Sequence, residues 1–438
     1  MKAAKVMGLF KISLKEKFNR DIFTLAGGTA SGQLLVVLAS PFLARMYTPA
    51  DFGLLGVYTA SLAILLVVSS LRYEFAIPIA KRDFAAVNLV ALCLIVVVLY
   101  ALAVGVALCL WGDIFAAWIK APALTSYVWL LSLSLVGAGG YKIFNFWAIR
   151  RRAFPSIAKT KVSQGFGQVA TQLLMGLWST GPAGLICGDI VGRFSGSMAF
   201  IPLLKELKKK MKMQVSRRGL LAAARRFRRF PLISSGSGLL NTLGLNLPVL
   251  LFTALYGVQV AGWFSFSQRI VSVPITLLGN AVAQAYIGEA SGLIYRNPHG
   301  LRRLYWQTAG KLLLFGALPI FLISLLSHWW FPWIFGGNWL NAGKFVQLMA
   351  CAYGIQFLVF PLSQTLNVLE RQDLQLLWDA GRLLAVLACF AAGYFFNWNP
   401  FITVLCYSIV IFLSYMLHML IAHNAMLSFE KGDLSLDG

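Results

Sequence analysis

Long apolar runs recur along the whole chain and are separated by short polar segments. About 20 apolar residues are enough for a helix to cross the hydrocarbon core of a bilayer. Because the runs are unbroken rather than alternating, they favour helices over a β-barrel. We therefore predict an all-α polytopic membrane protein with about twelve transmembrane helices. The expected spans are residues 22–44, 52–72, 85–110, 122–142, 161–180, 183–204, 233–255, 259–285, 309–328, 344–368, 375–396 and 400–422.

A basic segment at 205–232 separates the first six spans from the last six. Six is an even number, so both halves would enter the membrane in the same orientation. Residues 46–53 align with 255–262 at a constant offset of 209 and share a Tyr and a Gly. These features predict a parallel internal repeat with a central cavity between two six-helix bundles, as in many transporters. The predicted parts are an N-terminal basic segment 1–21, bundles 22–204 and 233–422, a linker 205–232 and a tail 423–438.

The composition is 59% hydrophobic and 12% charged, with a net charge of +23. Nearly all Lys and Arg outside the spans fall on one side of the predicted topology, and the opposite side holds only Arg45, Lys120 and Lys344. This positive-inside bias predicts that both termini are cytoplasmic. It also explains the charge without nucleic-acid binding. We expect the basic segment 205–232 to fix topology and to contact anionic lipid.

Polar stripes mark the helix faces that point away from lipid. Span 259–285 carries five polar residues within one face, at spacings of three or four. Span 161–180 repeats the pattern with glutamines, and span 233–255 adds Asn241. Single polar residues of this kind commonly join helices by hydrogen bonds. The longer stripes favour a hydrated cavity, and the residues predicted to line it are Gln164, Gln168, Gln172, Asn241, Ser272, Thr276, Asn280 and Gln284.

Charged residues inside the spans suggest what such a cavity could hold. Arg269 has no acidic residue at helical spacing in its own span. Other charges are spaced so that they could neutralise each other or couple transport to an ion: Asp189 with Arg193, Asp379 with Arg382, and Glu74 with Arg72. Arg72 is also compatible with a cytoplasmic phosphate site. Guanidinium groups bind phosphate oxygens well, and amides bind sugar hydroxyls, so a glycosylated lipid phosphate would suit this interior.

The sequence offers little for catalysis. The four histidines are scattered and form no metal-binding spacing with Cys, Asp or Glu. Paired carboxylates on one loop and a glycine-rich phosphate loop are both absent from the sequence. We therefore predict no catalytic residues, no metal site and no cofactor.

Two motifs resemble a known family. Residues 44–53 (ARMYTPADFG) followed by 71–78 (LRYEFAIP) are similar to the N-terminal signature of the bacterial polysaccharide transporters, the Wzx-type oligosaccharide flippases of the multidrug/oligosaccharidyl-lipid/polysaccharide superfamily. Residues 266–274 resemble the family's second-half motif. The resemblance implies alternating access between two bundles. The expected substrates are undecaprenyl-diphosphate-linked oligosaccharides, which would cross to the outer leaflet of the bacterial cytoplasmic membrane.

On this resemblance, Arg269 and Arg72 are candidates for contacts to the lipid diphosphate. The pathway would supply O-antigen, capsule or exopolysaccharide, and polysaccharide polymerase and chain-length proteins would be possible partners. Two alternatives remain open. A cation-coupled multidrug exporter of the same superfamily would prefer a net acidic cavity. A membrane polymerase or ligase would need a large outer loop with acidic residues, and the longest outer loop, at 329–343, has none.

Overall fold

The computed structural model describes residues 24, 27–228, 230–296 and 298–431, and the described part is built from helices. A helix at Gly27–Met46 comes first. The first-half elements that follow are α2 Pro49–Val68, η1 Tyr73–Phe75, α3 Ala76–Ile79, α4 Asp83–Trp118, η2 Pro122–Leu124, α5 Thr125–Val128, α6 Leu130–Arg150, α7 Phe154–Leu177, α8 Pro182–Met198, α9 Ile201–Gln214 and α10 Arg217–Arg226. The later elements are η3 Phe230–Ser234, α11 Ser235–Tyr256, α12 Val258–Arg296, α13 Pro298–Leu312, η4 Leu313–Ala317, α14 Leu318–Leu325, α15 Ser327–Phe335, η5 Gly337–Trp339, α16 Leu340–Leu348, α17 Ala350–Leu362, α18 Gln364–Val368, α19 Gln372–Phe395 and α20 Pro400–Glu430.

The helices agree with a multi-pass membrane protein. Within the described residues, eight helices are long and apolar enough to cross a bilayer, and up to eleven spans result if each of three bent helix pairs counts as one. Of the twelve predicted spans, 161–180 is the one without such a counterpart. It lies on α7, whose sequence is interrupted by lysines and glutamines. The all-α membrane class is thus confirmed, and the count of twelve stays a prediction.

The chain forms two compact units. Unit 1 contains the described residues up to Leu43, together with Leu62–Ile114 and Thr125–Gly236. Unit 2 contains Ala44–Ser61, Phe115–Leu124 and the described residues from Ser237 onward. The first turns of α2 therefore belong with the later helices. The predicted division into bundles 22–204 and 233–422 remains a prediction.

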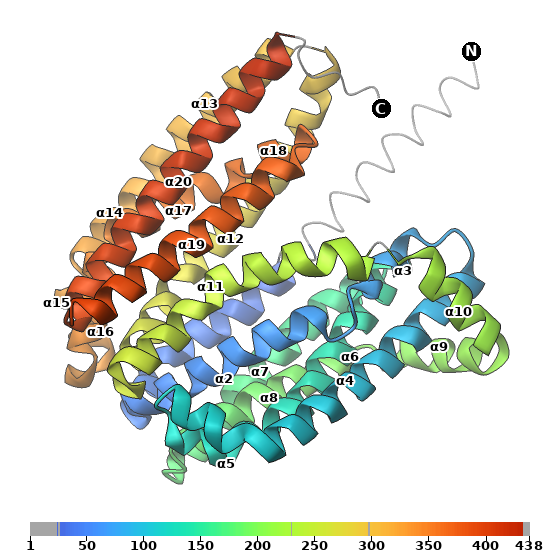
Figure 1. Ribbon diagram of the computed structural model, residues 1–438, viewed down its shortest axis with the longest axis horizontal. Coiled ribbons are helices and arrows are strands. Elements are labelled where there is room, and N and C mark those ends of the chain that lie inside the picture. Colours follow the sequence, from blue (N-terminus) through green and yellow to red (C-terminus); the bar gives the residue numbers. More distant parts are fainter. Residues whose placement is uncertain (1–23, 25–26, 229, 297, 432–438) are drawn as a thin grey trace. The chain divides into compact units, whose positions relative to one another are not determined.

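In unit 1, α8 packs along α7 and against α6. In unit 2, α17 is the central helix, and most of its side chains are buried against α12, α14 and α20. The C-terminal helix α20 runs beside α13 (Figure 1). Its last residue, Glu430, lies 3.4 Å from the guanidinium Nε of Arg302 and 3.3 Å from His299 Nδ1, so the Glu430 carboxylate joins the two helices.

A close helix crossing in unit 2 involves the two segments aligned in the sequence. A Cβ on Gly53 would overlap the carbonyl oxygen of Val258, and a Cβ on Gly262 would overlap that of Pro49. Pro49 and Val258, like Gly53 and Gly262, are related by the offset of 209. The contact therefore maps onto itself when the two segments are exchanged, as expected around a local two-fold axis. Only glycine allows so close a backbone approach.

Two segments expected to be loop or tail are helical. The predicted linker 205–232 contains most of α9 and all of α10, and α20 continues to Glu430, well beyond residue 422. Lys, Glu, Leu, Ala and Arg are good helix formers, so a charged composition did not imply irregular structure here. The predicted basic segment 1–21 and the last residues of the tail, 432–438, lie outside the described residues.

Candidate functional site

A polar pocket opens among four helices of unit 1. Its volume is about 330 Å³, and α2, α6, α7 and α8 supply its walls. The lining residues are Leu66, Ala138, Tyr141, Lys142, Asn145, Lys161, Gln164, Gln168, Asp189, Gly192 and Arg193. Amide, phenol and charged groups thus converge on one cavity within helices that the sequence predicts to cross a membrane.

Glycines on α8 bring the glutamine stripe of α7 close to the pocket. A Cβ on Gly192 would lie 2.8 Å from the Cβ of Gln168 and 3.0 Å from the carbonyl oxygen of Gln164, so the helices can approach only because glycine is there. One turn further, the fully buried Gln172 donates a hydrogen bond of 3.0 Å to Leu185 O. The structure places Gln164 and Gln168 in the pocket wall, whereas Gln172 joins the two helices.

Lys142 reaches the pocket from α6 and is held by a buried carboxylate. Its Nζ lies 2.5 Å from Glu74 Oε1, and Glu74 also accepts a hydrogen bond from the hydroxyl of Ser70. Glu74 is fully buried. Its ion pair is therefore with Lys142, whereas the guanidinium of Arg72 lies over the ring of Phe75 at 5.1 Å. Arg72 has a left-handed backbone with φ 61° at the turn after α2.

Asp189 and Arg193 form the ion pair that their spacing suggested. The guanidinium binds both carboxylate oxygens, with Nε 2.6 Å from Oδ2 and Nη2 3.1 Å from Oδ1. The Arg193 side chain is 28% exposed, and both residues line the pocket. The bidentate contact therefore fixes both side chains in the pocket wall, and their opposite charges largely neutralise each other.

Lys161 carries the remaining positive charge of the pocket. Its ammonium group lies 5.1 Å from the centre of the Tyr141 ring, a cation–π contact. Among the described residues, no carboxylate lies within ion-pair distance of Lys161. Since Lys142 and Arg193 have carboxylate partners, Lys161 gives the cavity its excess positive charge.

Sequence reasoning missed Lys142, Asn145 and Lys161. The predicted spans ended at 142 and began at 161, so both lysines were assigned to the membrane surface. Helix α6 continues to Arg150 and α7 begins at Phe154, which places these side chains on the pocket wall. A signal was present, because Lys161 lies three residues before Gln164 and extends the same stripe by one turn.

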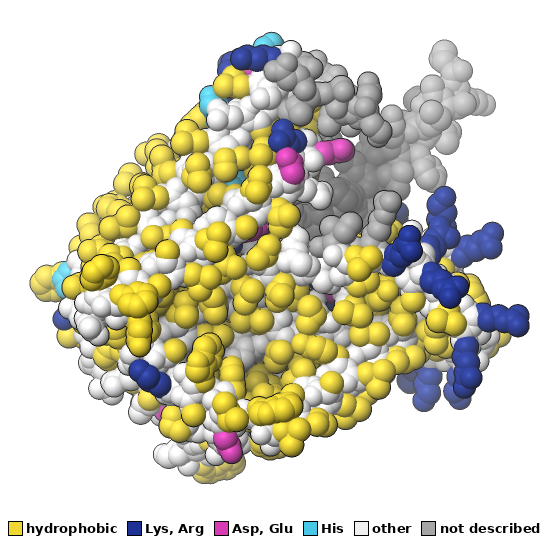
Figure 2. All heavy atoms as spheres, viewed as in Figure 1, with side chains coloured by type: hydrophobic (Ala, Val, Ile, Leu, Met, Phe, Trp, Pro, Cys, Tyr) yellow, Lys and Arg dark blue, Asp and Glu magenta, His cyan; other side chains and the backbone are white. Residues whose placement is uncertain are grey.

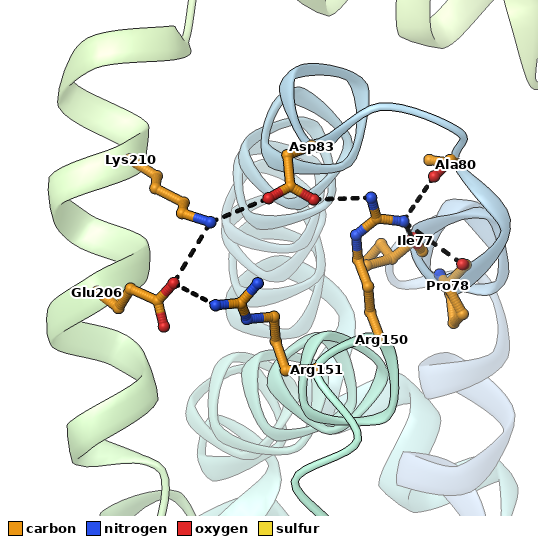
Figure 3. A network of polar contacts seen from close by, with 8 residues as sticks. All are labelled: Ile77, Pro78, Ala80, Asp83, Arg150, Arg151, Glu206 and Lys210. Atoms are coloured by element: carbon orange, nitrogen blue, oxygen red, sulfur yellow. Dashed lines mark hydrogen bonds and ion pairs between the residues drawn. The ribbon is translucent and has the colours of Figure 1, made fainter. Parts of the chain in front are cut away.

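At the C-terminal end of α6, a charge network connects this helix to α4 and α9 (Figure 3). Asp83 accepts from Arg150 Nη2 at 2.8 Å and from Lys210 Nζ at 3.0 Å. Glu206 lies 2.6 Å from Arg151 Nη2 and 3.3 Å from Lys210 Nζ. Lys210 thus bridges the two carboxylates, and the network holds these helix ends in place.

The polar stripe of α12 belongs to unit 2. Arg269 is half-buried, with its guanidinium 5.7 Å from the centre of the Phe52 ring. The hydroxyls of Ser272 and Thr276 donate to carbonyls of their own helix, at 3.3 and 3.2 Å. The stripe is mostly exposed, with Thr276 half-buried and Ser272, Asn280 and Gln284 exposed. That this stripe lines a cavity remains a prediction.

The ion pair between Asp379 and Arg382 in unit 2 is buried. Arg382 Nη2 lies 3.0 Å from Asp379 Oδ1 and also donates to Asn241 Oδ1 at 3.3 Å. The guanidinium lies 4.5 Å from the centre of the Trp378 ring. Asp379 and Arg382 are each 5% exposed. Asn241, predicted to line a cavity, thus takes part in a structural cluster that joins α11 to α19.

Solved transporter structures share this architecture. The lipid II flippase MurJ in an inward closed conformation matches with a TM-score of 0.70 and 11% identity, covering 93% of this chain and 89% of that chain. An inward-facing multidrug resistance MATE family transporter of the MOP superfamily matches with a TM-score of 0.65 and 15% identity, covering 91% of this chain and 96% of that one. The chain has the MOP-superfamily fold.

The sequence match is more specific. The profile of the family described as "Polysaccharide biosynthesis protein" matches residues 42–344, and the chain belongs to this family. The teichuronic acid biosynthesis protein TuaB of Bacillus subtilis (strain 168) is 28% identical over 159 residues. That match covers 36% of this chain and 32% of TuaB, less than two thirds of the relative's own length. The predicted membership in a polysaccharide biosynthesis family is confirmed, and the solved structures show the fold that the predicted superfamily shares.

Proposed function

We propose that the protein moves undecaprenyl-diphosphate-linked oligosaccharide units from the cytoplasmic to the outer leaflet for surface polysaccharide synthesis. The observation that carries this proposal is the unit 1 pocket, where Lys161 supplies excess positive charge beside Gln164, Gln168 and Asn145. An ammonium group attracts phosphate, and amides hydrogen-bond sugar hydroxyls. Family membership supports the pathway, and the MOP fold supports transport by alternating access.

The predicted topology indicates the side of the membrane toward which the pocket lies. Lys142 and Asn145 lie in the half of α6 that ends at Arg150, and Lys161 lies near the start of α7. Both of these helix ends are cytoplasmic in the topology predicted from the positive-inside bias. A pocket there would receive a headgroup from the cytoplasmic leaflet. The protein would thus be a multi-pass protein of the bacterial cytoplasmic membrane with both termini in the cytoplasm.

Arg269 and Arg72 remain candidates for diphosphate contacts on the family resemblance. We add Lys161 to them, because it lines a cavity with sugar-binding amides. A polysaccharide polymerase and chain-length proteins would act on the transported units and stay possible partners.

A cation-coupled drug exporter is the second candidate, since MATE structures share the fold. Such a protein would need a carboxylate available to a cationic substrate. In the pocket, Asp189 is bound by Arg193, and the neighbouring Glu74 is bound by Lys142. This pairing favours an anionic substrate.

Exchanging Lys161 for alanine tests the proposal. In a host that lacks its own copy, Lys161→Ala should reduce surface polysaccharide about 10- to 100-fold, the worth of one charge-assisted hydrogen bond. Lys161→Arg should keep part of the export because it keeps the charge. Lys159→Ala is the matched control, since Lys159 is exposed on the same helix. Full export by Lys161→Ala at normal protein level would contradict the proposal.

A further inference from the structure

The outward faces of α9 and α10 form one basic surface. Exposed positions recur about every four residues on both helices, so each exposes a single face. Figure 2 shows Lys and Arg side chains gathered where Figure 1 draws α9 and α10. The basic face consists of Lys205, Lys208, Lys209, Lys212, Arg217, Arg218, Arg225 and Arg226, together with Arg228 in the turn after α10, all of them exposed.

The inward faces hold this surface firmly on unit 1. Leu207 of α9 and Ala223 of α10 are buried in a core cluster with residues of α4 and α6. Asn88 of α4 clasps the turn between the two helices, since its amide donates to Gln214 O at 3.1 Å and its oxygen accepts from Ser216 N at 3.3 Å. The basic face is therefore part of a packed structure.

Basic residues on the inward and outward sides of α9 and α10 have different partners. Lys210, on the inward side of α9, binds both Asp83 and Glu206. Within the part of the chain that the structure describes, no residue of the basic face lies within ion-pair distance of a carboxylate. The outward cations thus leave a concentrated positive field for an external anion.

Apolar side chains and helix direction indicate which anion. Met213 is 78% exposed and Leu221 is 59% exposed, and both lie among the cations. Helices α8 and α9 together are apolar and long enough to form a candidate membrane span, but the pair is bent by 68° between the two helices. If α8 crosses the bilayer, α9 runs closer to the membrane plane. Cations mixed with exposed apolar residues on such a helix are typical of binding at a lipid interface.

We infer that the basic face binds the headgroups of anionic phospholipids in the leaflet beside α8. The cations would meet lipid phosphates, while Met213 and Leu221 would enter the boundary of the acyl chains. A soluble acidic protein would gain less from these two residues. This surface is separate from the transport pocket and does not depend on the proposed substrate.

The test uses the full chain purified in a neutral detergent. Phosphatidylglycerol and phosphatidylcholine are titrated separately, and bound lipid is counted by mass spectrometry of the intact complex. The wild-type protein should prefer phosphatidylglycerol, and raised salt should weaken that preference. The variant Lys208→Gln, Lys209→Gln, Lys212→Gln should lose about fivefold in affinity for each charge removed.

A matched variant removes the same charge elsewhere. Arg303, Lys311 and Lys431 are exposed in unit 2, and their exchange for glutamine should leave lipid preference unchanged. Circular dichroism and gel-filtration profiles check that both triple variants are folded. Three results would overturn the inference: equal binding of both lipids by the wild type, unchanged preference in the basic-face variant, or an equal loss in the control.

Discussion

The ion pair Asp189–Arg193 in unit 1 and the ion pair Asp379–Arg382 in unit 2 each lie within one turn of a helix, and the two pairs have different surroundings. In unit 1, Asp189 and Arg193 line an open pocket. In unit 2, Asp379 and Arg382 are enclosed, and the guanidinium is covered by Trp378. Nearly the same sequence spacing thus places one pair in a pocket wall and the other between packed helices. The neighbours of a pair decide whether its charges can reach a ligand.

The largest loss of stability is expected when the carboxylate of the buried Asp379–Arg382 pair is removed. Asp379→Ala would leave the Arg382 guanidinium buried without its carboxylate, which typically costs about 3–5 kcal/mol. Protein abundance and the thermal unfolding midpoint in detergent should both fall. The double variant Asp379→Ala, Arg382→Met should recover much of the loss, because it removes the stranded charge. A single variant as stable as the wild type would show that this pair is not structural.

Close packing in unit 2 can be tested at the glycine crossing. Gly262→Ala should destabilise the protein by about 1–3 kcal/mol, because the new Cβ meets the Pro49 carbonyl. Gly288→Ala is the control, since it lies on the same helix and a Cβ there has nothing within 4 Å. Unfolding midpoints of the two variants measure the difference. Equal stability would mean that the helices separate at little cost.

The pocket pair should behave differently from the enclosed one. Asp189→Asn should cost less than Asp379→Ala, on the order of 1 kcal/mol, because Asp189 is buried at 8% exposed but the Arg193 side chain is 28% exposed and can turn toward the pocket. The same thermal unfolding assay gives the comparison. If Asp189→Asn destabilised the protein as much as Asp379→Ala, the distinction between the two pairs would be lost.

The smallest expected effect concerns two neighbouring glutamines. In a background without native cysteines, Gln168→Cys should react faster with a small water-soluble thiol reagent than Gln172→Cys. Gln168 lines the pocket, whereas Gln172 is fully buried between α7 and α8. The rates can be read by mass-tag labelling of intact cells. Equal slow rates would mean that water does not reach the pocket wall.

The sequence predicted the helical membrane class. From polar spacing within apolar runs it also singled out Gln164 and Gln168 as cavity residues and Asp189 with Arg193 as a possible ion pair; all four side chains line the unit 1 pocket, and a role in binding substrate stays a prediction. Lys161 was assigned to the membrane surface because hydropathy alone began its span at residue 161, whereas α7 begins at Phe154. The Glu74–Lys142 pair could not be foreseen, since it joins residues far apart in the chain whose contact depends on how α6 packs. The hydrogen bond from Arg382 to Asn241 of α11 likewise depends on tertiary packing.

The segment Ala44–Ser61 is synthesised early but packs in unit 2 with helices that are synthesised much later. The Trp339 indole donates to Ala44 O at 2.8 Å across 295 residues of chain. At translation rates of about 5–20 residues per second, the early segment would wait roughly 15–60 seconds for that partner. During this interval the contacts of the early segment with the last third of the chain are missing. The second unit is therefore completed late in synthesis, and a ribosome that stops near the midpoint would release a chain whose earliest hairpin has no core to join.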